Sequence, residues 1–182
     1  EPRPIWRDLP VVAVLALVSL VKGTQLILGL ATLGVVLGAF AWQRRWRRGL
    51  QLGAGYAVAL LLLWLLAGQN PLPLPAYLRG IRELGGGYTE AMSLPTPPEA
   101  LNRALLLSAG LAACLGWALW HRRREAVPVA VVVLLAGHTF AQWKHGMVRS
   151  DTHVFIYFNY AIVAALTIHL AGWWLPPARA GL

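Results

Sequence analysis

Long apolar runs separated by short basic tracts dominate the hydrophobic pattern of this chain. Each run approaches or exceeds the length of about 20 predominantly apolar residues that a transmembrane helix needs. Lipid offers no hydrogen bonds to the backbone, so only helices or closed barrels cross it, and runs this long indicate helices. The pattern predicts an all-α, polytopic transmembrane helical bundle, a single domain over 1–182. We expect about five spans, at 11–42, 50–67, 104–120, 126–142 and 154–175.

The first run is longer than one span requires, and Lys22-Gly23-Thr24 interrupts it. We favour one tilted span with an irregular start. The alternative is a break at Gly23, which makes six segments. A lysine at membrane depth is costly and indicates a functional site, whereas a lysine at the end of a span extends its ammonium to the interface. The sequence leaves both interpretations of Lys22 open.

Composition supports a membrane protein, since 58% of the chain is hydrophobic and only 13% is charged. Soluble domains are about half apolar and about a quarter charged. The net charge of +9 would suggest nucleic-acid binding in a soluble protein. Here the arginines cluster beside the spans, which indicates contact with anionic membrane lipid. We therefore expect membrane lipid as a partner and no nucleic acid.

The two arginine-rich tracts, at 44–48 and 121–124, predict the topology of the chain. Such tracts mark the cytoplasmic side of a membrane. Alternation of the spans then places the loops 68–103 and 143–153 outside and the C-terminus in the cytoplasm. We expect an integral protein of a bacterial inner (plasma) membrane.

The second outer loop is dense in reactive side chains. Lys144 and Arg149 are candidates for binding a phosphate or diphosphate, because their cationic N–H donors match its oxygens. Asp151 suits a general base, or a carboxylate that holds Arg149 or His153. Trp143 suits stacking on a sugar. The alternative is a solvated interfacial loop whose cations extend from the membrane.

The first outer loop carries a second set of candidates. Its prolines prevent one continuous helix, but 77–84 has the pattern of a short amphipathic helix. Arg79 either binds substrate or pairs with Glu83 one turn later. Tyr88 suits a sugar ring, and Glu90 follows a glycine run that permits close approach to a ligand.

We expect no metal and no cofactor. His145 and His153 fit neither an HxxxH nor an HExxH pattern. His138 and His169 cannot share a haem in straight helices, because at 1.5 Å per residue their expected depths differ by roughly 18 Å. The single cysteine, Cys114, has the setting of a small buried hydrophobe.

Three segments resemble polytopic glycosyltransferases of the GT-C type, which include bacterial relatives of protein mannosyltransferases and lipid A aminoarabinose transferases. They are Leu-Val-Ser-Leu-Val-Lys-Gly-Thr at 17–24, Gly-Tyr-Thr-Glu-Ala-Met at 87–92, and the segment from Trp143 to His153. Together they cover about a fifth of the chain. The resemblance implies transfer of a sugar from a polyprenyl-phosphate donor at the outer membrane face. Such enzymes have more spans, so it also implies a fragment or a reduced relative.

Under this hypothesis, Asp151 or Glu90 handles the proton of the acceptor. The residues that bind the substrate are Lys22, Arg79, Tyr88, Trp143, Lys144, Arg149 and His153.

Two other functions are compatible with the sequence. One is a non-catalytic accessory subunit of a larger membrane complex, such as a photosynthetic or respiratory assembly, which the small size and the nine tryptophans favour. The other is a transporter, which ranks last because polar residues within the spans are scarce beyond Lys22 and His169.

Overall fold

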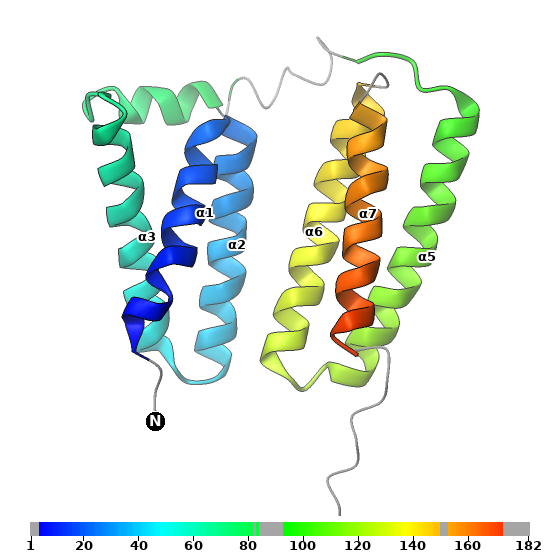
Figure 1. The fold of residues 1–182 in the computed structure, drawn as a ribbon, viewed down its shortest axis with the longest axis horizontal. Coiled ribbons are helices and arrows are strands. Elements are labelled where there is room, and N and C mark those ends of the chain that lie inside the picture. Colours follow the sequence, from blue (N-terminus) through cyan, green and yellow to red (C-terminus); the bar gives the residue numbers. More distant parts are fainter. Residues whose placement is uncertain (1–3, 82, 84–92, 150–152, 173–182) are drawn as a thin grey trace, which may run out of the picture. The chain divides into compact units, whose positions relative to one another are not determined.

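A computed structural model describes residues 4–81, 83, 93–149 and 153–172 (Figure 1). Its regular elements are η1 (Ile5–Arg7), α1 (Leu9–Val21), α2 (Gly23–Trp42), α3 (Trp46–Leu66), α5 (Pro98–Arg122), α6 (Ala126–Val148) and α7 (His153–Leu170). Residues 74–81 are also helical. Five of these helices are long and apolar enough to cross a membrane, namely α2, α3, α5, α6 and α7. The all-α transmembrane bundle is confirmed, and the chain is an integral membrane protein.

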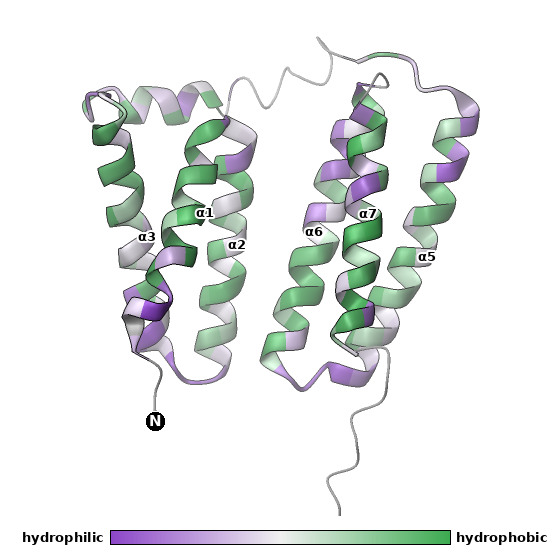
Figure 2. Cartoon of the chain, viewed as in Figure 1, coloured by the Kyte–Doolittle hydropathy of each residue, from purple (hydrophilic) through white to green (hydrophobic). Residues whose placement is uncertain are grey.

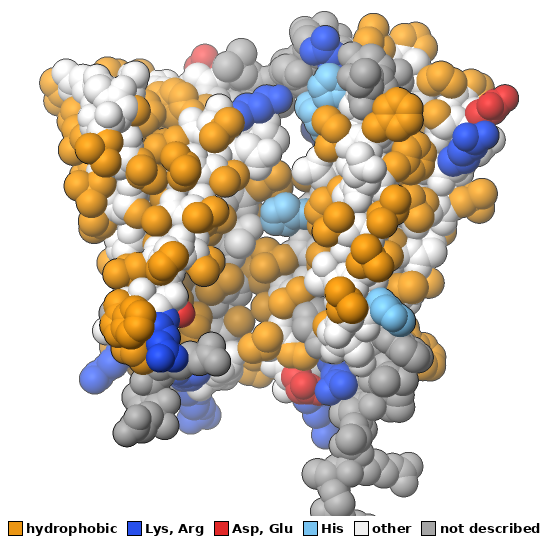
Figure 3. Space-filling view, in the orientation of Figure 1, with side chains coloured by type: hydrophobic (Ala, Val, Ile, Leu, Met, Phe, Trp, Pro, Cys, Tyr) orange, Lys and Arg blue, Asp and Glu red, His pale blue; other side chains and the backbone are white. Residues whose placement is uncertain are grey.

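The helices are apolar along their lengths and polar at their ends (Figure 2). Large side chains such as Leu66, Leu106 and Phe155 face outward, which suits helices whose solvent is hydrocarbon. Lysine and arginine gather where helices begin and end (Figure 3). The chain forms two compact units, unit 1 at Glu1–Tyr88 and unit 2 at Thr89–Leu182. The expectation of a single domain remains a prediction.

The first apolar run of unit 1 is not the single span that we favoured. It breaks at Lys22, whose backbone is extended at φ −157° and ψ 146°, and α1 and α2 pack against each other on either side of the break. An unbroken helix over 9–42 would measure about 50 Å, far more than the hydrocarbon thickness of about 30 Å. The break lets the chain reverse direction and bury one face of each helix.

Small and polar side chains hold α1, α2 and α3 together. Ser19 is fully buried, and its Oγ donates a hydrogen bond to the Leu15 carbonyl at 2.7 Å. The Tyr56 hydroxyl of α3 donates to Ser19 Oγ at 2.9 Å. Gly29 of α2 faces the same point, because a Cβ built there would lie 2.1 Å from Ser19 Oγ. Close approach of these helices therefore requires glycine at 29.

Unit 2 is a bundle of α5, α6 and α7. One core cluster, towards the α5–α6 turn, contains Leu111, Leu115, Ala118, Val132, Ala164 and Ile168. The other contains Ala104, Tyr157 and Ala161. Tyr157 is fully buried, and its hydroxyl lies 2.5 Å from Ser108 Oγ. The same hydroxyl donates to the Ala104 carbonyl at 3.3 Å, so this buried polar group has hydrogen-bond partners on α5.

The helices extend further into the predicted loops than the sequence suggested. α6 continues to Val148, so the first part of the predicted loop 143–153 is helix. α5 begins at Pro98, inside the predicted loop 68–103. The sequence prediction ends one span at Gln142 and begins another at Ala104, but a helix continues beyond hydrocarbon where its polar side chains reach the interface.

Candidate functional site

The candidate site lies in unit 2, where the end of α6 meets the start of α7. A Cβ on Gly146 would lie 3.1 Å from the His153 carbonyl oxygen and 3.1 Å from Tyr157 Cβ. Glycine at 146 therefore allows the two helix ends to approach closely. This contact fixes the positions of the candidate side chains on either side of it.

Two imidazoles meet at this junction. The rings of His145, on α6, and His153, the first residue of α7, have centroids 4.8 Å apart and planes inclined at 79°. The sequence placed both residues in one loop without indicating that they touch. The structure brings them together because the chain reverses direction between them.

The chain segment before α5 also joins this junction. The Leu94 N–H donates to the Val148 carbonyl at 2.8 Å, and Leu94 pairs with Arg149 in a short parallel bridge. Thr96 Oγ1 donates to the Met147 carbonyl at 2.8 Å. These bonds satisfy carbonyls at the end of α6 that have no partner within the helix. Sequence reasoning missed this pairing, although the prolines exclude a helix in the segment before α5 and so leave backbone N–H groups of that segment available.

We call the set Trp143, Lys144, His145, Arg149 and His153 the basic corner. Lys144 is exposed, and the other four are half-buried. The sequence prediction named four of these five as substrate-binding residues, and the described residues place all five at one junction.

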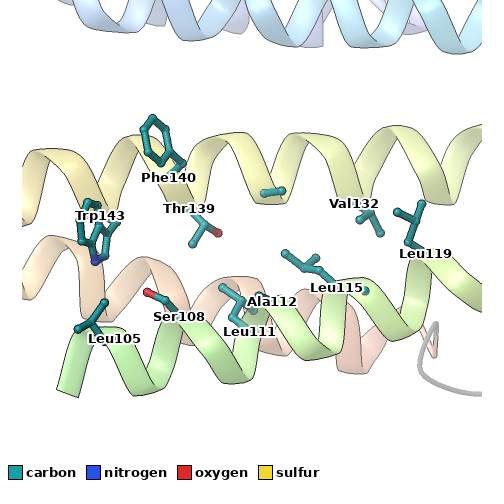
Figure 4. A pocket seen from close by; sticks show the side chains of 12 residues that line it. Leu105, Ser108, Leu111, Ala112, Leu115, Leu119, Val132, Thr139, Phe140 and Trp143 are labelled. Carbon is teal, nitrogen blue, oxygen red and sulfur yellow. The ribbon is translucent and has the colours of Figure 1, made fainter. Parts of the chain in front are cut away.

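An apolar groove of about 430 Å³ runs between α5 and α6. Figure 4 shows Leu105 and Trp143 at one end and Leu119 and Val132 at the other. At 1.5 Å per residue, the α5 wall from Leu105 to Leu119 is about 21 Å long. The residues that line the whole groove are Leu105, Ser108, Leu111, Ala112, Leu115, Gly116, Leu119, Val132, Ala136, Thr139, Phe140 and Trp143.

The two hydroxyls in the groove are already engaged. Ser108 Oγ donates to the Ala104 carbonyl at 2.7 Å, and Thr139 Oγ1 donates to the Leu135 carbonyl at 2.7 Å. The groove therefore presents a wall that suits an apolar chain. Sequence reasoning missed it, because it depends on how two helices pack.

Lys22 and Arg79 belong to unit 1. Lys22 is exposed and immediately precedes α2, which has the length of a complete span. This position favours a lysine at the end of a span over one at membrane depth. Ile81 packs over the adjacent Gly23, with Ile81 Cγ1 3.0 Å from where a Cβ would stand, and Arg79 is exposed on the same short helix.

The predicted residues Tyr88, Glu90 and Asp151 lie outside the described residues. Within the described part of the chain, no three histidine, cysteine or acidic side chains form a group that could hold a metal ion. Comparisons with protein-family models, curated proteins and solved structures found no match for this chain.

Proposed function

We propose that the chain is a GT-C-type glycosyltransferase-like membrane protein, or part of one, and that unit 2 binds a polyprenyl-phosphate-linked sugar. The observation that carries this proposal is the position of Trp143. It lines one end of the apolar groove and belongs to the basic corner. A ligand with an apolar tail and a phosphate head needs these two environments side by side.

The chemistry follows from the charges at the corner. When a sugar leaves a polyprenyl phosphate, negative charge develops on the phosphate oxygen. The Lys144 ammonium and the Arg149 guanidinium are suited to stabilise that charge, and arginine does so through two parallel hydrogen bonds. Asp151 or Glu90 remains our candidate for the base that accepts the proton of the acceptor hydroxyl.

The same proposal includes a location. We infer a bacterial plasma membrane, with the basic corner on the outer face and the α2–α3 and α5–α6 turns in the cytoplasm. The arginine tracts of those turns support this orientation through the positive-inside rule.

The groove can be tested by filling it. We expect Ala112→Trp, whose new side chain occupies the groove, to weaken binding of a radiolabelled polyprenyl phosphate to the full chain in nanodiscs at least tenfold. Ala113→Trp is the matched control, since Ala113 is exposed on α5 but is not one of the groove-lining residues. Equal binding by both variants would contradict the role of the groove.

The basic corner can be tested by changing its charge. We expect Lys144→Gln to reduce the same affinity about fivefold, because it removes one contact between a cation and the phosphate, and Lys144→Arg to retain most of it. If wild-type protein binds no polyprenyl phosphate, the donor-binding proposal is wrong. The accessory subunit would then be the leading hypothesis, and its partners should co-purify.

A further inference from the structure

The opposite end of α5 and α6 carries a second cationic cluster that the proposed function does not use. Its members at the end of α5 are Trp117, Trp120, His121 and Arg122, and those that follow before α6 are Arg123, Arg124 and Glu125. From here on, the name α5–α6 turn refers to this whole set. We propose that this turn binds the phosphate headgroup of an anionic phospholipid, separately from the substrate site at the basic corner.

Aromatic rings hold the basic side chains of this turn in place. The Arg123 guanidinium lies over the Trp120 ring, 4.6 Å from its centroid, and donates to the Trp120 carbonyl at 3.4 Å. The centroids of the His121 and Trp117 rings lie 4.2 Å apart, and His121 Nδ1 lies 3.0 Å from the Trp117 carbonyl oxygen. An arginine already ordered against a ring loses less conformational entropy when it binds a ligand.

Arg122 has one donor that the described residues leave without a partner. Its Nη1 donates to Glu125 Oε1 at 3.0 Å, while its Nε is buried and has no hydrogen-bond acceptor among the described residues. A buried donor without an acceptor is costly, and a bound water or anion is one way in which such a group is satisfied. A phosphate oxygen is an acceptor of the right charge for this position.

The charge of the turn also fits a lipid phosphate. Three arginines and one glutamate leave a formal charge of +2 with histidine neutral, and a phosphodiester headgroup carries one negative charge. Trp117 and Trp120 are 53% and 68% exposed, as tryptophans of the membrane interface are. A ligand at this turn therefore meets cations at its head and an apolar helix surface below, which a phospholipid matches and a free anion does not.

The test is a comparison of bound lipids by native mass spectrometry of the detergent-solubilised full chain. We expect wild type to retain phosphatidylglycerol at least tenfold better than phosphatidylcholine. Arg122→Gln with Arg123→Gln should lower phosphatidylglycerol retention about tenfold. Glu125→Gln should raise it several-fold, because it frees the Arg122 guanidinium.

A matched control is the α2–α3 turn, where Arg44 and Arg45 are exposed. The Arg45 guanidinium also lies over a ring, that of Phe40, 5.7 Å from its centroid, but no buried side-chain donor of that turn, all of which the structure describes, lacks a hydrogen-bond partner. We therefore expect Arg44→Gln with Arg45→Gln to change retention less than twofold. An equal loss from this control, or no preference for phosphatidylglycerol, overturns the specific site. Competition by millimolar inorganic phosphate without any lipid preference overturns the assignment to a lipid. Failure here leaves polyprenyl-phosphate binding at the basic corner unchanged, so the two proposals fail independently.

Discussion

At the residue scale, single small side chains decide how closely the helices of unit 1 approach. Ser19, Gly29 and Tyr56 come from three different helices and meet at one buried point. Hydrophobic burial does not drive helices together in lipid, so close packing and hydrogen bonds between helices must do so. This point is therefore where unit 1 is most sensitive to substitution.

We expect Gly29→Ala to destabilise unit 1 by about 1–3 kcal/mol, the usual cost of overfilling a packed interior. The new methyl group would displace Ser19 Oγ and break its hydrogen bonds to Leu15 and Tyr56. The measurement is thermal or denaturant unfolding in detergent, followed by tryptophan fluorescence.

The control is Gly34→Ala in the same helix, where no atom beyond the helix's own neighbouring backbone lies within 4 Å of the new Cβ. It should be neutral or slightly stabilising, because alanine favours a helix over glycine by about 1 kcal/mol. Adding Ser19→Ala should recover part of the loss in Gly29→Ala, since it removes the clashing oxygen. Similar stability of both glycine variants would disprove the close contact.

The residue types of the basic corner could be predicted from sequence, but their arrangement could not. Lys144, Arg149 and His153 stood out because outer loops seldom need so many cations and imidazoles. The contact of His145 with His153 depends on the packing of α6 against α7, which Gly146 permits. A glycine in a sequence does not indicate which backbone it will meet.

At the element scale, the helices could be predicted because their apolar runs are long. The residues at which they end could not be predicted. The sequence predicts a break at Gly23 only as an alternative, since Lys22, Gly23 and Thr24 interrupt the run. None of the three excludes a helix. The break follows from the thickness of the bilayer and from packing of α1 on α3. A local sequence pattern contains no information about either.

The junction of α6 and α7 makes a prediction at the same scale. Gly146→Ala should lower stability by about 1–3 kcal/mol, because the new methyl group meets the His153 backbone at 3.1 Å and the backbone cannot rotate away. It should also weaken polyprenyl-phosphate binding, since His153 and Arg149 would shift with α7 and the end of α6. Unfolding and ligand binding on the same preparation measure both effects.

Gly137→Ala, also in α6, is the comparison for this experiment, because nothing lies within 4 Å of its Cβ. We expect it to keep both stability and binding. A Gly146→Ala protein with wild-type stability would mean that the helix ends do not approach as described.

At the scale of the whole molecule, the topology predicts which helix ends share a side of the membrane. With Cys114 replaced by alanine, single cysteines at Lys22 and Lys144 should react with a membrane-impermeant maleimide added outside intact cells. Cysteines at Arg44 and Arg124 should react only after the membrane is opened. All four side chains are exposed, so access to the reagent and not burial decides the result.

Labelling of Arg44 or Arg124 variants from outside would reverse the orientation that the arginine tracts predict. Labelling of the Lys22 and Arg44 variants from the same side would contradict α2 as a complete span. The topology can be argued from sequence because it depends on charge counts, which need no knowledge of packing.

The shortness of α1 has a consequence for the lipid around it. Its 13 residues measure about 20 Å, against a hydrocarbon thickness of about 30 Å, and valines along it face outward. This hydrophobic mismatch requires local thinning of the bilayer beside α1 or side chains that extend from its ends, at a cost of fractions of a kcal/mol per ångström. Any thinning should therefore stay local to α1, because α2 and α3, with 20 and 21 residues, measure about 30 Å and match the hydrocarbon on their own sides of unit 1.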